Sequence, residues 1–276
     1  MSRLAAIQMA SGPNVSANLT EAGRLISQSV DAGAELVVLP ENFAFMGMQE
    51  SDKVGISEAP GSGAIQDFIA AQADKHRVWI VAGTIPLQTQ DSQRVAAACL
   101  LFDSHGAQVA RYDKVHLFDV KIEESEETYN ESLTTEAGKQ ISVVDTPFGR
   151  LGLAVCYDLR FPEIFRRMAT ESVEIIAIPS AFTAITGKAH WEVLLRARAI
   201  ENLSYVIASA QGGYHVNSRE TFGHSMIIDP WGRVLDCLPS GSGYVMAKMD
   251  KQQLETTRRN FPVLQHRKLP CDLPST

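Results

Sequence analysis

Short apolar runs alternate with longer segments of helical periodicity along most of the chain. The run Leu36–Pro40 is apolar throughout and β-branched at its centre, which is typical of a strand buried on both faces. Similar runs predict strands at Leu4–Met9, Leu36–Pro40, Val78–Thr84, Val95–Phe102, Ala107–Tyr112, Ile141–Val144, Leu151–Val155, Glu174–Pro179, Tyr205–Ser209, Ser225–Ile228 and Tyr244–Lys248.

The segments between these runs have the spacing of amphipathic helices. Gly33 supplies a helix stop, and Gly106 is placed as the turn residue of a hairpin. One helical face carries Trp191, Leu195 and Ala199 at four-residue spacing, which indicates a packing stripe rather than a cofactor site. Helices are predicted at Asn18–Asp31, Ala64–Lys75, Glu163–Ala169, Trp191–Leu203 and Gln252–Asn260, so the fold class is α/β with many strands.

Length and composition favour one large folded unit. The chain has 276 residues, of which 45% are hydrophobic, and no linker or abrupt change of composition divides it. The polar stretch 123–131 is short enough to be an ordered loop. We therefore expect a single domain over residues 1–276 with a short C-terminal tail.

Charge and cysteine usage exclude several classes of function. The net charge of -7, with scattered basic residues, argues against nucleic-acid binding. The four cysteines lack disulfide or metal spacing, and His215 and His224 belong to no metal motif. The first apolar stretch is too short for a signal peptide or membrane span. A soluble cytoplasmic protein without metal or organic cofactor is expected.

Cys156 is the most informative single residue, because it stands where an apolar run ends and a helical pattern begins. In a strand-turn-helix arrangement the thiol lies near unpaired helix amides, whose field favours a thiolate. The same position also suits a small buried hydrophobic side chain, which is the commoner role of an isolated cysteine. The sequence therefore predicts a candidate nucleophile and leaves a structural alternative open.

Two further ionisable residues occupy comparable positions. Glu41 follows one predicted strand and Lys114 another. Taken alone, Glu41 suits a helix cap or the surface, and Lys114 suits a solvated position. Together with Cys156 they could hydrolyse an amide, because a thiol can attack the carbonyl, a carboxylate can move the proton and an ammonium can balance the oxyanion.

The motifs that carry these three residues resemble those of the nitrilase, or carbon-nitrogen hydrolase, superfamily. They read Leu39-Pro40-Glu41-Asn42, Asp113-Lys114-Val115-His116-Leu117 and Cys156-Tyr157-Asp158-Leu159-Arg160-Phe161-Pro162-Glu163. The resemblance extends along nearly the whole chain. It implies a four-layer α-β-β-α sandwich, with Glu41 as general base, Lys114 as oxyanion stabiliser and Cys156 as nucleophile.

The resemblance also implies a second carboxylate and a second oxyanion donor. In the similar Nit subgroup a Glu-Ser segment lies between the lysine and the cysteine, which points to Glu131 in Tyr129-Asn130-Glu131-Ser132. Its implied work is to orient Lys114 and pass protons. The backbone amide of Tyr157 is the implied oxyanion donor. The neighbouring acidic residues Glu123, Glu124, Glu126 and Glu127 are the alternatives to Glu131.

Substrate-binding residues are expected on both sides of the nucleophile. Arg160 is placed to hold a substrate carboxylate bidentately, although it could instead pair with Asp158 or Glu163. The segment Pro179–Gly187 is expected to form a loop over the site. Its Phe182 and Thr186 are candidate contacts, with a core position as the alternative for Phe182.

Within the superfamily, four stretches most resemble the deaminated glutathione amidases: Ser180–Phe182, Gly187–Glu201, Gly223–Gly232 and Pro262–Arg267. Such enzymes release 2-oxoglutarate and cysteinylglycine, and Arg160 suits that dicarboxylic acyl half. Lys188 departs from the proline that relatives commonly have after Thr-Gly.

Two alternative functions remain, and the resemblance also implies an assembly. An ω-amidase acting on 2-oxoglutaramate would use the same acyl half and the same catalytic residues. A noncatalytic binding protein or a redox sensor is a further alternative, against which the intact Glu41, Lys114 and Cys156 argue. The resemblance implies a homodimer or higher homo-oligomer that pairs through helices, with the helices after Cys156 and at Trp191–Leu203 as candidates.

Overall fold

Two β-sheets form the centre of the computed structural model, which describes residues 2–122, 127–216 and 218–269. The strand order in the first sheet is β18-β1-β2-β3-β5-β4, with β6 and β9 also paired to β5. Its strands are β1 (Ser2–Gln8), β2 (Leu36–Val38), β3 (Trp79–Val81), β4 (Ile85–Gln88), β5 (Val95–Phe102), β6 (Gln108–Asp113), β9 (Thr135–Glu136) and β18 (Gly243–Met249).

The second sheet has the order β10-β11-β12-β13-β16-β17, and its central strands β11, β12 and β13 run parallel. Its strands are β10 (Ser142–Thr146), β11 (Gly149–Leu153), β12 (Ile175–Ser180), β13 (Tyr205–Ala210), β16 (Ser225–Ile228) and β17 (Val234–Leu238). Two hairpins stand apart from both sheets: β7 (Asp119–Ile122) with β8 (Glu127–Asn130), and β14 (Gly212–Tyr214) with β15 (Glu220–Phe222).

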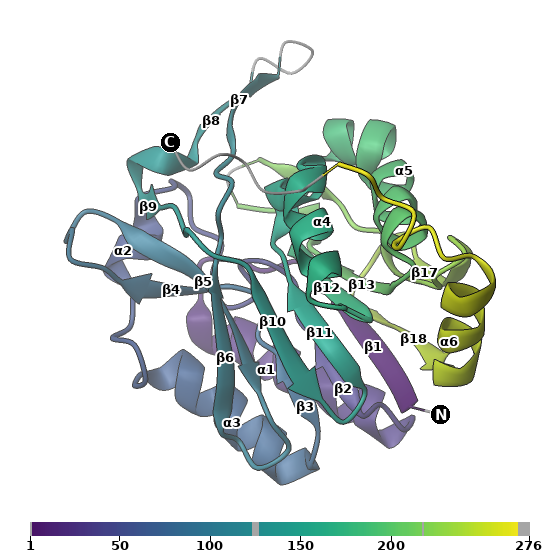
Figure 1. The fold of residues 1–276 in the computed structure, drawn as a ribbon. Helices are drawn as coiled ribbons and strands as arrows, with labels where there is room; N and C mark the ends of the chain where they lie inside the picture. Colours follow the sequence, from purple (N-terminus) through teal and green to yellow (C-terminus); the bar gives the residue numbers. More distant parts are fainter. Residues whose placement is uncertain (1, 123–126, 217, 270–276) are drawn as a thin grey trace.

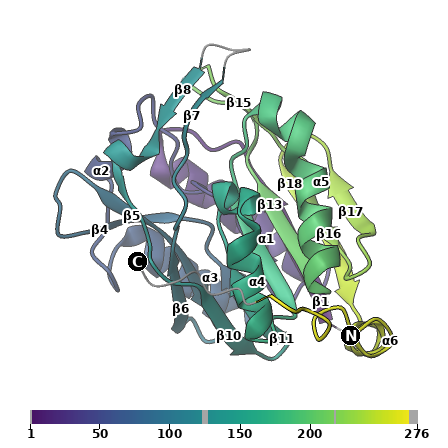
Figure 2. The ribbon, with the colours of Figure 1, turned by 45° about the horizontal axis from the view of Figure 1, so that its top comes forward.

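Helices cover the outer face of each sheet, so the layers follow the order α-β-β-α (Figures 1 and 2). Helices α1 (Val15–Asp31) and α3 (Ala64–His76) lie on the first sheet. Helices α4 (Pro162–Thr170) and α5 (Ala184–Asn202) lie on the second. The remaining helices are α2 (Asp52–Gly55), α6 (Lys251–Asn260) and the 3₁₀ turns η1 (Glu131–Leu133) and η2 (Cys156–Arg160). The predicted four-layer sandwich is confirmed.

The inner strands β1, β2 and β5 of the first sheet are apolar at successive positions because both of their faces are buried. In β1, Leu4 and Ala6 face the core between the sheets, whereas Ala5 and Ile7 pack under α1 and α3. Alternate residues therefore serve two different cores, and the sequence shows a continuous apolar run instead of a polar alternation.

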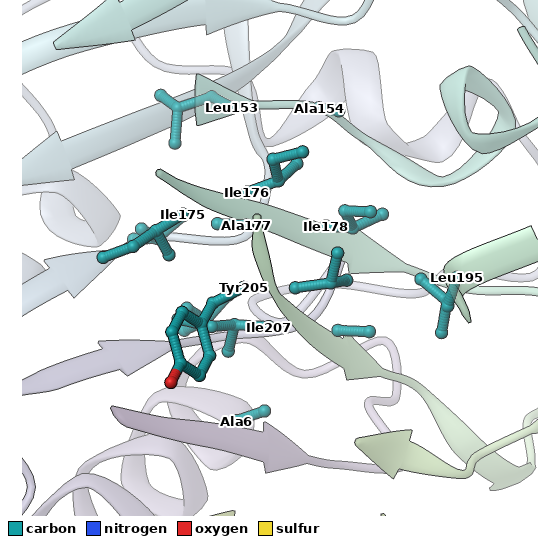
Figure 3. Packing of buried hydrophobic residues seen from close by; sticks show 14 of the residues in the cluster. Ala6, Leu153, Ala154, Ile175, Ile176, Ala177, Ile178, Leu195, Tyr205 and Ile207 are labelled. Atoms are coloured by element: carbon teal, nitrogen blue, oxygen red, sulfur yellow. The ribbon is translucent and has the colours of Figure 1, made fainter. Parts of the chain in front are cut away.

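The core between the sheets joins strands that are far apart in the sequence. Strand β1 packs against β13 and β16 of the other sheet. Figure 3 shows Ala6 of β1 with residues of β12 and β13, among them Ile175, Tyr205 and Ile207, in the same buried cluster. This shared core fixes the two sheets relative to each other, and with them the strand ends that carry the candidate site.

Gly83 allows two strand ends of the first sheet to approach closely. Its φ is 52°, and a Cβ atom there would lie 2.0 Å from the carbonyl oxygen of Pro40. Any side chain would push away the segment that leads from β2 into Glu41. The glycine therefore helps to set the position of that carboxylate.

Several boundaries differ from the sequence prediction. Val95–Phe102 and Ser225–Ile228 form strands at the predicted residues, but α5 begins at Ala184 rather than near Trp191. Thr183 caps this helix by accepting a hydrogen bond from the amide of Thr186, so the expected loop up to Gly187 is wrong. Gly187 lies inside the helix, and a glycine suits this position because a Cβ there would be 2.3 Å from Phe222.

The short strands β4, β9 and β17 and both hairpins were not predicted, since each depends on pairing rather than on a long apolar run. The predicted C-terminal tail and the alternatives Glu123, Glu124 and Glu126 lie outside the described residues. Within the described ranges, no helix combines the length and hydropathy that crossing a bilayer requires.

Candidate active site

Cys156 stands at a sharp backbone turn between β11 and η2. Its φ is 46°, a left-handed conformation that is rare for a residue with a side chain. The amide of Val155 donates to Oδ2 of Asp158 at 2.8 Å, which closes the turn and holds that conformation. The thiol is buried, with 7% of the residue exposed, and it lines a pocket. A strained turn that presents a side chain to a pocket is typical of a nucleophile.

Asp158 ties this turn to the segment that carries Lys114. Besides the Val155 amide, its Oδ2 accepts a hydrogen bond from the Tyr112 hydroxyl at 2.7 Å. Its Oδ1 accepts from the amide of His116 at 3.0 Å and lies 2.7 Å from the His116 ring Nδ1. Because Asp158 is fully buried, these contacts hold strand β6 of one sheet against the turn that follows β11 of the other.

Lys114 follows β6 and lies between two carboxylates. Its Nζ is 2.8 Å from Oε1 of Glu41 and 3.0 and 2.8 Å from the two oxygens of Glu131. The lysine side chain is only 2% exposed. The structure thus brings together Glu41, Lys114, Glu131 and Cys156 from four separate parts of the chain. Of the described glutamates in the polar stretch, Glu131 lines the pocket and Glu127 does not.

Hydrogen bonds fix the Glu131 carboxylate and the main chain of Glu41 and Lys114. Oε2 of Glu131 accepts a hydrogen bond from the amide of Phe118 at 2.7 Å. The carbonyl of Glu41 accepts from Nε2 of Gln211 at 3.0 Å, which ties the residue to the second sheet. Lys114 itself is fixed by its amide, which donates to the carbonyl of Ala97. Hydrogen bonds that involve main-chain groups therefore help to position all three charged residues.

The charges of the site reinforce one another. Burial alone would lower the pKa of Lys114, but Glu131 and Glu41 outweigh that effect and hold it well above its usual value. Burial would likewise raise the pKa of Glu131, and the charges of Lys114 and then Lys53 bring it below its usual value. Both directions keep an ammonium beside ionised Glu131 at neutral pH.

The expected thiolate at Cys156 is wrong for the resting state. Burial raises the pKa of this thiol well above its usual range, and the charge of Glu41 raises it further. Lys114 and the backbone amide of Ala181 oppose this shift but do not reverse it. Cys156 begins a five-residue 3₁₀ turn, so the field of a long helix is absent there. The surroundings of the sulfur therefore favour a neutral thiol beside a carboxylate.

The pocket above the thiol encloses about 520 Å³ of open space, which includes solvent at its mouth. Arg160, Tyr157, Phe182 and Thr186 all line it. The guanidinium of Arg160 lies over the rings of Phe182 and Tyr157, at 5.2 and 5.8 Å, and its Nη1 is 3.2 Å from His190 Nδ1. The four predicted substrate contacts therefore share one cavity with the thiol.

Phe182 and Thr186 also make contacts that stabilise the fold. Phe182 packs on Trp191 with ring centroids 4.9 Å apart, so it belongs both to the core and to the pocket wall. Thr186 lies in the first turn of α5, where its hydroxyl is 2.9 Å from that of Thr183. Lys188 is exposed on the same helix and is not among the lining residues.

Several pocket residues were not predicted. Glu50, Lys53 and Arg219 line the cavity, and Ala181 turns its amide toward the sulfur. No motif marks them in the sequence, and only the tertiary fold brings them to the nucleophile. Among the residues that the structure describes, no cluster of His, Cys, Asp or Glu is arranged to hold a metal ion.

Comparison with known proteins agrees with this geometry. The family model described as carbon-nitrogen hydrolase matches residues 3–259. Proteins named deaminated glutathione amidase are 41% identical in Yersinia enterocolitica, over 98% of this chain and 94% of that protein, and 45% identical in Synechocystis, over 95% and 97%. The crystal structure of the C. elegans NitFhit protein has a TM-score of 0.90 and 37% identity, covering 97% of this chain and 65% of that one.

Asp158→Asn is expected to reduce both stability and turnover. The amide nitrogen of asparagine would face donors that now bind a carboxylate oxygen, which costs roughly 2 to 4 kcal/mol. Thermal unfolding should show a clearly lower Tm, and kcat should fall more than KM changes. Tyr112→Phe removes only one donor and should cost about 1 kcal/mol. Equal Tm values for Asp158→Asn and wild type would rule out this role.

Alkylation of Cys156 by iodoacetamide is expected to be slow at neutral pH. Since the pKa of this thiol is raised, its thiolate fraction at pH 7 is below that of free cysteine and rises only above the ordinary thiol pKa of about 8.5. Peptide mass spectrometry across a pH series, with N-acetylcysteine as the reference, measures the midpoint. A midpoint below that of the reference would mean a resting thiolate paired with Lys114.

Proposed function

The chain belongs to the carbon-nitrogen hydrolase family, and on this premise we propose that it hydrolyses deaminated glutathione to 2-oxoglutarate and cysteinylglycine. The observation that carries the chemistry is the contact of Lys114 with both Glu41 and Glu131 in the pocket that holds Cys156. The substrate is supported by the shared name of relatives that are 41% and 45% identical over nearly the whole chain.

Acylation begins with attack of the Cys156 sulfur on the amide carbonyl carbon. Glu41 accepts the thiol proton as the carbon-sulfur bond forms, and the carbonyl oxygen becomes an oxyanion. Lys114 and the backbone amide of Tyr157 stabilise that charge. When the carbon-nitrogen bond breaks, Glu41 returns the proton to the leaving nitrogen. Cysteinylglycine departs as an amine, and the 2-oxoglutaryl group remains as a thioester on Cys156.

Deacylation repeats these steps with water. Glu41 accepts a proton from a water molecule, whose oxygen attacks the thioester carbon. Lys114 again balances the oxyanion. Collapse breaks the carbon-sulfur bond, the sulfur recovers a proton from Glu41, and 2-oxoglutarate leaves. The same carboxylate thus serves in both halves, while Glu131 holds the lysine in place.

A neutral resting thiol suits this mechanism. A thiolate would add a third negative charge beside Glu41 and Glu131, which only one buried ammonium balances. Coupling proton transfer to attack avoids forming that charge in advance. The raised pKa of Cys156 is therefore compatible with a nucleophile whose base lies beside it.

Arg160 is the proposed partner of the 2-oxoglutaryl carboxylate. Its planar fork lies over two aromatic rings, which fix its plane at the pocket wall. An ω-amidase acting on 2-oxoglutaramate would use the same contact, because the two substrates share this acyl half. The leaving group alone distinguishes the two activities.

Turnover of deaminated glutathione, followed as 2-oxoglutarate with a coupled dehydrogenase, is expected to exceed that of 2-oxoglutaramate. Cys156→Ala should lower kcat by at least about 10⁴-fold, since it removes the attacking atom. Cys237→Ser is the matched control. It changes another free thiol, which does not line the pocket, and should retain turnover. Preference for 2-oxoglutaramate would instead identify an ω-amidase.

The proposed assembly is a homodimer or higher homo-oligomer that pairs through α5. Val193 is 70% exposed, and Ile200 lies seven residues later on the same helix face. The turn with Trp231 packs beside Ile200, and the Trp231 ring contacts Phe261, so these side chains form one apolar patch. The outer face of α4 exposes Glu163, Arg167 and Thr170 and is a weaker candidate.

Val193→Glu is expected to shift the protein toward monomer, because it places a charge within this patch. Sedimentation velocity measures the change, and Val109→Glu, at an exposed site on β6, is the control. A wild-type monomer at micromolar concentration would contradict the assembly.

The proposed compartment is the reducing cytoplasm, which the free thiols Cys99, Cys156 and Cys237 support.

A further inference from the structure

A second group of charges lies in the pocket, apart from the catalytic residues and Arg160. Lys53 comes from the short helix α2, and its Nζ is 3.0 Å from Glu50. Arg219 comes from the segment before β15, and its Nη1 is 4.0 Å from the same glutamate. Neither cation is needed for the acylation or deacylation steps.

These residues mark the junction of two cavities. A second hollow, with about 360 Å³ of space that includes open solvent, shares four of its lining residues with the catalytic pocket: Asn42, Glu50, Lys53 and Arg219. Arg160 lines only the catalytic pocket. A substrate that extends from the thiol past Lys53 would therefore enter the second cavity, with a cation at each end.

Both cations are held in place. The side chains of Lys53 and Arg219 are 17% and 12% exposed. Arg219 donates to the carbonyl of Ala181 at 2.8 Å and lies over the ring of Tyr129 at 5.0 Å. Lys53 is close enough to lower the pKa of Glu131. They are thus preorganised beside the site rather than spread on the outer surface.

We propose that Lys53, assisted by Arg219, binds the terminal carboxylate of the leaving group. This inference rests on the proposed function, since deaminated glutathione carries one carboxylate on its 2-oxoglutaryl half and another on its glycine. Arg160 would hold the first and Lys53 the second. The reacting amide would then lie between them, over Cys156.

When substrate binds, its carboxylate would replace Glu50 as the partner of Lys53, and the contact between Lys53 and Glu50 is weak enough to allow this. Glu50 is 47% exposed, so its pairing with Lys53 is screened by water and weak. A substrate carboxylate inside the pocket can replace it, and Glu50 can turn to solvent. The same glutamate keeps the mouth from binding anions indiscriminately, because it partly balances the two cations when no substrate is bound.

The test compares three substrates that share one acyl half: deaminated glutathione, its C-terminal carboxamide and 2-oxoglutaramate. Wild type should prefer the carboxylate over the carboxamide in kcat/KM by roughly tenfold to hundredfold, the range of a charge-assisted hydrogen bond. Lys53→Gln should abolish most of that preference, and Lys53→Arg should restore it. Because each preference is a ratio within one variant, a change in the amount of folded enzyme cancels.

Arg160→Gln is the matched comparison for the other end. It should lower kcat/KM for all three substrates by a similar factor and leave the carboxylate preference intact. An unchanged preference in Lys53→Gln, or its loss in Arg160→Gln instead, would overturn the assignment while leaving the proposed function standing. Absence of wild-type turnover of deaminated glutathione would overturn both.

Discussion

The buried ammonium of Lys114 between two carboxylates is the interaction on which the site depends. Removing these charges from water carries a desolvation penalty that only close, hydrogen-bonded partners offset. The lysine finds such partners in Glu41 and Glu131, and its pKa is raised as a result. Loss of either carboxylate would leave the cation less well balanced, so the site is stable only as a set.

The packing of two sheets allows the residues of the site to come together. Glu41 and Lys114 follow strands of one sheet, whereas Cys156 follows a strand of the other. Only the packing of the two sheets face to face brings the three together. Asp158 then locks the arrangement, because one buried carboxylate accepts hydrogen bonds from both sides. The catalytic geometry is thus a property of the inter-sheet core rather than of any single loop.

Sequence patterns predicted the features that depend on local chemistry. Strand β5 was placed at its observed residues because its apolar run is long. Glu131 was implied by the resemblance to the Nit subgroup, and the structure places it against Lys114. The start of α5 was missed because Gly187 reads as a loop residue, whereas it is required there by the close approach of Phe222. The state of Cys156 was also missed, since desolvation depends on neighbours that a linear pattern does not reveal. Lys53 and Arg219 were not predicted as pocket residues for the same reason.

The proposed catalytic charges and the proposed specificity charges come from different kinds of structure. The proposed catalytic residues Glu41, Lys114 and Cys156 follow strands of the two main sheets, and buried hydrogen bonds join these strand ends. Lys53 and Arg219 come from a four-residue helix and from the connection into a two-stranded hairpin, outside both main sheets. Substitutions in those peripheral segments can change which leaving group fits without disturbing the inter-sheet core. This separation gives a physical reason why one Glu-Lys-Cys arrangement can serve amides that differ only beyond the scissile bond.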